Sequence, residues 1–574
     1  MLILGISSFE HDTAAALLND GQVVAAIEND KLERSTVAGV PDKAIQFCLA
    51  QAGASWHQLD AIAVATSPVR RWLRRSMLPA KLSQFSPMAY AHHGASELGS
   101  LVRDLSHFRV LRQSNGNSRD LRFEHHLCHA ANAYFLSPFD RALVVTIDEE
   151  GDGNSVVVAI AEGNAIRVLR RIAFPNSPAW VYSQVTELLG FAAHKEEHKT
   201  QWLSLGGEPV YKSAFLEMLR APGSCLPHLN RSFFAPGLAG TPAFSPKFYR
   251  QLDLPEDKAK LDDSQRRALA SSLQEAIADV VADLVDFFRD RENVSTVCLA
   301  GGLMSNTLLV ATLEQRLGMN ELFVPPAPGN AGCAMGAAML TWHETFGNPR
   351  REPQAAAYWG PAFSRSEIKE VLDNCKVRYS LQTTEDRKLD AALQLLQAGK
   401  IVGWYQGATE FGPRSLGNRS ILASPWALYV RENLNDFIKH REWFRPFALA
   451  VPEEDAGRFF QCSHLCRSMN TLGKVLPEAV DLFRDFMLPG DLVRLHVVTR
   501  DANLHFWRLL RRFGEQAPAP VLVNTSFNLF GEPMVVKPRD AVRSYFCSGI
   551  DALIIDNFVL AKAGLSQSTA RLAS

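Results

Sequence analysis

Two histidines and an aspartate stand at spacings that could bind a metal ion. His125 and His129 lie four residues apart, so on a helix they share one face. Asp148 follows the apolar run 142–147, which would present its carboxylate at the end of a strand. Two imidazoles and a carboxylate can form an open metal site. His126 would point elsewhere, and a helix with unrelated histidines is the alternative to a metal site.

His11 is a candidate general base. It lies in the polar stretch 7–13, directly after the first apolar run of the chain. A histidine near its ordinary pKa can take a proton from a substrate hydroxyl. The alternative is a histidine that is simply solvated on its loop, and the residue type alone does not separate the two.

Basic residues in two C-terminal segments predict an anion pocket. The glycine-rich segment 407–420 carries Arg414, and the aromatic segment 439–447 carries Lys439 and Arg445. Arginines on a glycine-rich loop suit phosphate or carboxylate, because a guanidinium donates a fork of N–H groups to paired oxygens.

The other polar residues of the C-terminal segments are weaker evidence for a ligand site. Arg441 stands beside Glu442 and fits a structural ion pair equally well. The apolar strand pattern that opens onto Asn524 and Ser526 offers neutral hydrogen-bond partners for a polar ligand. Loops use such residues in any case, so this signal is modest by itself.

The elements that must position these residues follow a repeated pattern. Residues 1–27 are typical of a strand, a polar loop, a strand, a tight turn and a strand, and residues 141–172 repeat that order. We therefore predict an internally duplicated α/β domain in which His11 faces Asp148 across a cleft. Two unrelated hairpins are the alternative.

Later segments indicate a nucleotide site and a second domain. The strand pattern 296–299 runs into AGGLMSN, where glycines before a helix would let the backbone approach a nucleotide. A segment rich in Pro, Gly and charge, 346–362, predicts a linker. We expect domains at residues 1–345 and 363–564, with a short tail at 565–574.

Composition narrows the class of protein. The chain has 574 residues, 47% of them hydrophobic, which is enough for two or three domains. Its formal charge of −1 gives no global basic field that would favour nucleic acid. The nine scattered cysteines do not predict a disulfide framework. We expect a soluble, cytoplasmic protein because no continuous apolar stretch is long enough for a membrane span and the first residues read as a buried strand.

Taken together and in this order, the motifs resemble the O-carbamoyltransferase family of nodulation and antibiotic-tailoring enzymes, which includes tobramycin carbamoyltransferase. The resemblance covers nearly the whole chain. Its most specific pieces are GPRSLGNRSIL, REWFRPFA and VLVNTSFNLFGEP, and it is supported by HDTAAALL, HHLCHAANAYF, EHKTQWLS and AGGLMSN. It implies a duplicated actin-like ATPase (Kae-like) domain followed by a YrdC-like α/β domain.

The resemblance also implies a two-step reaction. Similar enzymes condense ATP, with Mg²⁺, and carbamoyl phosphate into carbamoyl-adenylate in the YrdC-like domain. The intermediate passes internally to the first domain, which transfers the carbamoyl group to a hydroxyl of a small molecule such as a secondary metabolite or a sugar. Enclosure of the labile intermediate limits its hydrolysis. Neither the acceptor nor an oligomeric state follows from the sequence.

Site residues are carried over by motif position. His11 would be the base or would orient the carbamoyl group. The residues implied to hold a metal, with Fe²⁺ the usual occupant, are His125, His129, Asp148 and Asn330. Those implied to meet adenine nucleotide in the Kae-like domain are Lys199, Gly301, Gly302 and Asn306. Those implied to hold carbamoyl phosphate or ATP in the YrdC-like domain are Arg414, Lys439, Arg445, Arg494, Asn524 and Ser526.

The chain departs from the family pattern at several positions. Asn330 replaces an aspartate, and a neutral amide ligates a cation more weakly than a carboxylate. Near residues 28–37 a usual Lys-His pair is missing, which leaves Lys31 and Arg34 as the nearby bases. His496 stands in a segment where Arg-Pro-Gln is usual. The choice of acceptor therefore cannot be inherited from the family.

Three other functions are alternatives to carbamoyl transfer. A hydrogenase-maturation factor would carry an acylphosphatase domain and paired CxxC fingers, which the sequence lacks. A tRNA-modifying enzyme is disfavoured by the missing basic surface signal. A non-catalytic nucleotide-binding relative is favoured by Asn330 and opposed by the intact His11, His125, His129 and Asp148.

Overall fold

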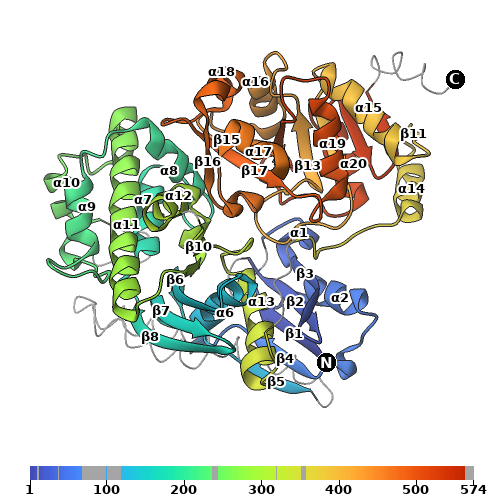
Figure 1. The fold of residues 1–574 in the computed structure, drawn as a ribbon. Coiled ribbons are helices and arrows are strands. Elements are labelled where there is room, and N and C mark those ends of the chain that lie inside the picture. Colours follow the sequence, from blue (N-terminus) through green and yellow to red (C-terminus); the bar gives the residue numbers. More distant parts are fainter. Residues whose placement is uncertain are drawn as a thin grey trace. The chain divides into compact units, whose positions relative to one another are not determined.

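Two five-stranded sheets with the same topology form the first part of the molecule (Figure 1). One sheet has the order β3-β2-β1-β4-β5 and the other has the order β8-β7-β6-β9-β10. In both sheets the first strand is antiparallel to the second and parallel to the fourth. This repetition confirms the predicted duplicated α/β architecture. The strands are β1 (Leu2–Ser7), β2 (Ala14–Asn19), β3 (Gln22–Glu28), β4 (Ala61–Val64), β5 (Arg119–Arg122), β6 (Arg141–Gly151), β7 (Asn154–Glu162), β8 (Ala165–Ala173), β9 (Val297–Ala300) and β10 (Leu322–Phe323).

This computed structural model describes residues 1–8, 12–36, 38–67, 98–99, 102, 118–235, 244–318, 320–350 and 357–562. The predicted base His11 lies outside the described residues, so its role stays a prediction. The chain divides into two compact units, one of residues 1–26 and 38–353 and the other of residues 27–37 and 354–574.

The helix that follows the fifth strand of each half packs on the sheet of the other half. α13 (Gly332–Leu340) contacts β1, β2 and β4, while α6 (His125–Leu136) contacts β6 and β9. The two helices also cross each other, and small residues make the close approach possible. A Cβ atom added at Gly336 would lie 1.8 Å from the Cys128 carbonyl oxygen. The crossing therefore fixes α6, whose first turn carries His125 and His129.

The second half of the first unit contains a group of additional helices. The longest is α11 (Asp263–Glu292), which begins at a capping box and ends at Asn293 in the left-handed region. In the capping box, Asp262 Oδ1 accepts from the Gln265 amide at 2.8 Å and Gln265 Oε1 accepts from the Asp262 amide at 3.1 Å. The other helices of this unit include α2 (Asp42–Gln51), α7 (Pro178–Leu188), α8 (Glu197–Leu203), α9 (Lys212–Leu219), α10 (Pro246–Gln251) and α12 (Thr307–Leu317).

A ten-stranded mixed sheet forms the second unit, in the order β11-β20-β19-β12-β13-β18-β14-β17-β16-β15. Apolar side chains cover both faces, because successive residues of one strand enter different cores. In β12, Trp404 belongs to one buried cluster and Tyr405 to the other. The strands are β11 (Ser380–Leu381), β12 (Val402–Tyr405), β13 (Arg419–Ala423), β14 (Ala448–Pro452), β15 (Phe460–Gln461), β16 (Leu472–Val475), β17 (Leu492–Val498), β18 (Leu522–Ser526), β19 (Ala552–Ile555) and β20 (Phe558–Ala561).

The helices of the second unit lie on both faces of this sheet. α15 (Glu385–Gln397) and α19 (Leu504–Gly514) supply residues to the core that contains Trp404. α14 (Arg365–Asn374), α16 (Val430–Leu434), α17 (Glu453–Phe459) and α20 (Pro538–Phe546) supply residues to the core that contains Tyr405. Both faces are therefore buried, as the apolar runs of the strands require. A further helix, α18 (Val480–Phe483), is short.

Two observations differ from the predicted domain limits. Residues 27–37, including α1 (Asn29–Glu33), cluster with the second unit although the sequence placed them in the first domain. The last residues of the predicted linker are also bound into the second unit, since the Phe411 amide donates to the Ala357 carbonyl at 2.7 Å and the Thr409 amide donates to the Pro361 carbonyl at 3.0 Å. Hydrogen bonds to a distant loop are not visible in local composition.

Within the described part of the chain, no helix is both long enough and apolar enough to cross a membrane. The nine cysteines are free thiols.

Candidate metal and anion sites

The predicted metal triad assembles at the first turn of α6. His125 is the first residue of the helix and His129 lies one turn later, with their Nε2 atoms 3.0 Å apart. Asp148, on β6, places Oδ2 2.9 Å from His129 Nε2 and 3.5 Å from His125 Nε2. All three side chains are buried. The structure thus brings two imidazoles and a carboxylate to one point.

The protonation states suit a cation. Burial lowers the pKa of His129, which favours the neutral imidazole that binds metals. Burial by itself would raise the pKa of Asp148, but its hydrogen bonds with His125 and His129 hold that pKa well below its ordinary value. Neutral imidazoles and an ionised carboxylate are the ligand forms that a divalent metal requires.

Asp152 and Gly151 fix the position of His125, and the sequence analysis missed both. Asp152 Oδ2 accepts from the His125 amide at 3.0 Å, and Oδ1 accepts from the Thr66 hydroxyl at 3.0 Å. A Cβ atom added at Gly151 would lie 2.2 Å from His125 Cδ2, so only glycine fits. The acidic and glycine residues that follow Asp148 in the sequence were the signal from which these contacts to His125 could have been predicted.

His126 is a core residue, as its predicted direction away from the metal triad implies. Its Nδ1 lies 2.8 Å from the Thr146 hydroxyl and its Nε2 lies 3.1 Å from the Asn154 carbonyl. Burial lowers the pKa of His126 to about 3, so the ring is neutral and structural.

Asn330 faces the same region. It lines a small cavity together with Ser7, Ser8, Ala65, Thr66, His125, Gly151 and Asp152. Its side chain is buried, and its Oδ1 atom has no hydrogen-bond partner among the described residues. A buried amide oxygen normally has a partner, so this position suits a bound cation or a donor group. Cys333 adds a thiol within 4.8 Å of a ring nitrogen of each histidine of the triad. The donor set fits a metal ion.

The residues predicted to meet nucleotide in the first unit have clear structural partners. Gly301 has φ of 97°, and a Cβ there would lie 2.1 Å from the Ile147 carbonyl oxygen. Asn306 caps α12, because its Oδ1 accepts from the Leu309 amide at 3.0 Å. The same Oδ1 accepts from Gln274 Nε2 at 3.1 Å, so both acceptor positions of the amide are used.

Gly302 and Lys199 complete that predicted set. A Cβ at Gly302 would lie 3.0 Å from Asp148 Oδ1, which places this glycine against the metal triad. Lys199 is buried and pairs with Glu196 at 2.6 Å. Contact of these residues with a nucleotide remains a prediction.

The second unit contains a cluster of five basic side chains, Arg414, Lys439, Arg441, Arg445 and Arg494. All but Arg441 were predicted to hold an anion, and that role remains a prediction. Burial and then repulsion between the members lower the pKa values of four of them. The pKa of Arg414 falls to about 10 and that of Arg441 to about 9. The pKa values of Lys439 and Arg494 fall well below their ordinary values. Positive charges that destabilise one another in a buried site are stabilised by an anion among them.

Lys439 is held by the last residue of β18 and by Asn528, two residues beyond it. Its Nζ donates to the Ser526 carbonyl at 2.5 Å, to Asn528 Oδ1 at 2.8 Å and to the Asn528 carbonyl at 3.1 Å. It ends a π-helical turn, Asn435–Lys439, a rare element that often occurs at functional sites. Arg441 and Asn528 belong to the site, although the sequence analysis did not assign them to it.

Asn524 joins the glycine-rich loop to β17. Its Nδ2 donates to the Ser415 carbonyl at 3.1 Å and to His496 Nδ1 at 3.1 Å. Burial lowers the pKa of His496 to about 3, so a neutral ring accepts this bond. The side chain of Asn524 therefore orients the loop that carries Arg414.

Comparison with known proteins agrees with this layout. Residues 2–339 match the family described as Carbamoyltransferase N-terminus, and residues 393–562 match the family described as Carbamoyltransferase C-terminus. The chain belongs to the carbamoyltransferase family. It is an enzyme of the transferase class.

Three relatives illustrate how far the similarity extends. Protein sll1178 of Synechocystis is 33% identical, over 98% of this chain and 97% of that one. Nodulation protein NolNO of Sinorhizobium fredii is 30% identical, over 97% of this chain and 80% of that one. The 3'-hydroxymethylcephem-O-carbamoyltransferase of Amycolatopsis lactamdurans is 28% identical, over 52% of this chain and 54% of that one.

Two buried charged residues fold the glycine-rich loop of this carbamoyltransferase. Glu410 Oε1 accepts from the amides of Leu416, Asn418 and Arg419 at 2.8, 2.9 and 3.1 Å. The Arg419 guanidinium donates to backbone carbonyls on both sides of the loop, those of Gln406, Asn418, Pro361 and Gly407. Arg419, in the same motif as Arg414, is therefore a structural residue.

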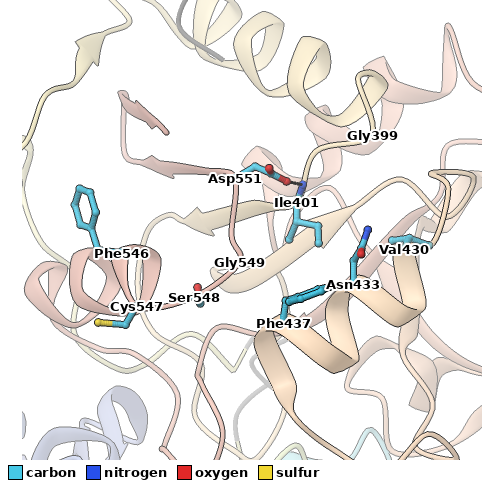
Figure 2. A pocket seen from close by; sticks show the side chains of 10 residues that line it. All are labelled: Gly399, Ile401, Val430, Asn433, Phe437, Phe546, Cys547, Ser548, Gly549 and Asp551. Carbon is cyan, nitrogen blue, oxygen red and sulfur yellow. Dashed lines mark hydrogen bonds between the residues drawn. The ribbon is translucent and has the colours of Figure 1, made fainter. Parts of the chain in front are cut away.

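A second pocket of the carbamoyltransferase is open and has a different character (Figure 2). Figure 2 shows Phe437, Ile401 and Phe546 around it, and the carboxylate of Asp551 accepts from the Ile401 amide at 2.8 Å. The residues that line this pocket include no lysine or arginine.

Proposed function

We propose that this carbamoyltransferase makes carbamoyl-adenylate from ATP and carbamoyl phosphate, and transfers the carbamoyl group to a hydroxyl of a small molecule. The observation that carries the proposal is the cluster of basic side chains in the second unit, in which desolvation and neighbouring positive charges lower the pKa values of Arg414, Lys439 and Arg494. Both proposed substrates are phosphate anions, which such a cluster binds through charge-assisted hydrogen bonds. Family membership supports the carbamoyl group as the group transferred.

The second unit would carry out activation. Water would first cleave carbamoyl phosphate to carbamate and phosphate. A carbamate oxygen would then attack the α-phosphorus of ATP, which forms carbamoyl-adenylate and expels pyrophosphate. Arg414, Arg445 and Arg494 offer guanidinium forks for those phosphate oxygens, while the Lys439 ammonium is a point charge held in place by Ser526 and Asn528. Fixed donors of this kind stabilise charge that develops as the leaving groups depart.

The first unit would carry out transfer. His11 would take the proton from the acceptor hydroxyl as its oxygen attacks the carbamoyl carbon, and AMP would leave. His125, His129 and Asp148 would hold a divalent metal, with Asn330 as a neutral fourth donor. When bound, the metal supplies Lewis-acid polarisation of an oxygen at this site. Asp152 keeps His125 in place through the amide of α6.

A hydroxylated small molecule is the proposed acceptor. Support comes from the name of the cephem relative, which is an O-carbamoyltransferase acting on a hydroxymethyl group.

One experiment tests the proposal in two stages. The protein is incubated with ATP, Mg²⁺ and carbamoyl phosphate, and pyrophosphate release is measured; release that depends on carbamoyl phosphate is expected. A panel of sugars, aminoglycosides and other polyols is then screened for a mass gain of one carbamoyl group. Failure of pyrophosphate release with every added metal would overturn the activation step.

A further inference from the structure

An acidic and a basic side chain near the N-terminus belong to the second unit. The strand β3 ends at Glu28, and residues 27–37 cluster with residues 354–574. Glu28 and Lys31 in this segment are each only 7% exposed and lie 2.9 Å apart. A buried ion pair is weak evidence for stability, because removing both charges from water costs as much as their attraction returns. The role of the Glu28–Lys31 pair must therefore follow from the groups that the two side chains contact.

Glu28 and Lys31 form hydrogen bonds with the backbone of the glycine-rich loop, residues 407–420. Lys31 Nζ donates to the Glu410 carbonyl and to the Gly412 carbonyl, both at 2.8 Å. The Gly412 amide donates to Glu28 Oε1 at 2.8 Å. Three hydrogen bonds thus hold the backbone at residues 410 and 412, immediately before Arg414. Charge-assisted bonds of this kind are stronger than neutral ones.

The rest of the segment is anchored at a different place. The Arg34 guanidinium donates to the Pro533 carbonyl at 2.5 Å, to the Met534 carbonyl at 2.9 Å and to Glu532 Oε2 at 2.6 Å. Arg34 therefore ties down the end of the segment, while Glu28 and Lys31 grip the loop itself.

The loop needs such restraint because of the charge that it carries. Arg414 and Arg494 repel each other, and Arg445 destabilises both. Glu410 restrains residues 416–419 from inside the loop, and the Glu28–Lys31 pair restrains residues 410–412 from outside it.

We propose that Glu28 and Lys31 are positioning residues of the anion site, which hold the loop so that the Arg414 guanidinium faces its phosphate ligand. This inference rests on the proposed function, since the ligand is taken to be carbamoyl phosphate or ATP. The activation site is then built from both ends of the sequence. Residues 354–574 alone lack part of it.

The test is Lys31→Met in the full-length chain. Pyrophosphate release is measured against carbamoyl phosphate concentration. Because small displacements of a binding group cost roughly ten- to hundredfold, we expect the KM for carbamoyl phosphate to rise by about that factor. The fall in kcat should be smaller. Lys31→Arg should recover part of the loss, because a guanidinium can donate to both carbonyls. Transfer from supplied carbamoyl-adenylate should stay at the wild-type rate.

Lys388→Met is the matched control. Lys388 is also a buried lysine of the second unit and pairs with Glu385, three residues before it, at 2.8 Å. It donates to the Gln406 side chain and does not touch residues 410–412. Its loss should lower the melting temperature without raising the KM.

The outcomes separate the two proposals. If the wild-type chain releases no pyrophosphate with carbamoyl phosphate, the proposed function fails. If the wild-type chain is active and Lys31→Met keeps the wild-type KM, or Lys388→Met raises it equally, the positioning role is wrong. Should Lys31→Met not fold, Glu28→Met removes the acceptor of the Gly412 amide with little change of volume, and the same KM criterion applies.

Discussion

The metal triad and the cationic cluster differ in how their charges are balanced. His125, His129 and Asp148 form hydrogen bonds with one another, so an ionised carboxylate already has partners before any metal binds. In the cluster, desolvation and then neighbouring cations lower the pKa values of Arg414 and Arg494, while Glu442 Oε2 lies 3.7 Å from Arg445 Nη1. The triad pairs opposite charges within itself, whereas the five basic side chains of the cluster outnumber their acidic neighbour, so a bound anion would offset the excess positive charge. The cluster is therefore the clearer sign of a substrate.

Removal of one cluster member should have the largest effect. Arg414→Ala removes a fixed donor from the place where phosphate charge develops, and we expect pyrophosphate release to fall roughly 10²–10³-fold. The rate is measured with saturating ATP and carbamoyl phosphate. Arg387→Ala, an exposed arginine on α15, is the control and should match the wild-type chain. A fall of less than tenfold for Arg414→Ala would remove the cluster from the activation step.

The cluster should also respond strongly to simple anions. Pyrophosphate at about 100 times its Kd should add about 2.7 kcal/mol to the free energy of unfolding, because it binds only the folded protein. Arg494→Met should reduce the rise in melting temperature that pyrophosphate produces, because it removes one positive charge from the cluster. Thermal unfolding followed by fluorescence, with and without pyrophosphate, measures this rise. A rise equal to that of the wild-type chain would place Arg494 outside the anion site.

The pH dependence of anion binding follows from Lys439. Burial and then Arg441 and Arg445 hold its pKa well below the ordinary lysine value. A bound anion favours the charged ammonium and raises that pKa, so binding takes up a proton. The affinity for carbamoyl phosphate should therefore fall as pH rises through the pKa of Lys439 in the ligand-free protein. Calorimetry in buffers of different ionisation enthalpy counts the proton, and proton release on binding would reverse the argument.

Asn330 should give the smallest effect. Asn330→Asp places a carboxylate beside the triad, and carboxylates bind divalent cations more tightly than amides do. We expect the affinity for Fe²⁺ or Zn²⁺ to rise by about tenfold, a typical consequence of changing one group around a metal. Competition with a metal-binding dye measures it without any enzyme assay. Thr312→Asp, a partly buried position on α12, is the control; an unchanged affinity in Asn330→Asp would place residue 330 outside the metal site.

The sequence predicted those features that local pattern encodes. The strand and turn pattern of residues 1–27 and 141–172 predicted the duplicated sheets, and the four-residue spacing predicted that His125 and His129 share a face. Features that depend on distant contacts were not predictable. Lys31 meets the Glu410 carbonyl 379 residues further along the chain, and no local signal marks that contact. Asp152 and Asn528 were not predicted because they contact His125 and Lys439, which only folding brings close to them.

Motif membership also did not reveal what each residue does. Arg414 and Arg419 lie in the same glycine-rich motif, but the two terminal nitrogens of the Arg419 guanidinium donate to backbone carbonyls, among them those of Gln406 and Gly407. Asn306 and Asn524 were predicted ligand contacts, and in the structure each orients other protein groups. Only the hydrogen-bond partners separate residues that hold the loop from residues that face the pocket.

The central claim is that the two units carry separate half-reactions, and one comparison tests it most directly. Arg414→Ala and His11→Asn are each assayed for pyrophosphate release and for transfer from supplied carbamoyl-adenylate to an accepted hydroxyl compound. The account predicts that Arg414→Ala loses pyrophosphate release and keeps transfer, while His11→Asn keeps pyrophosphate release and loses transfer. Equal loss of pyrophosphate release in both variants would contradict it.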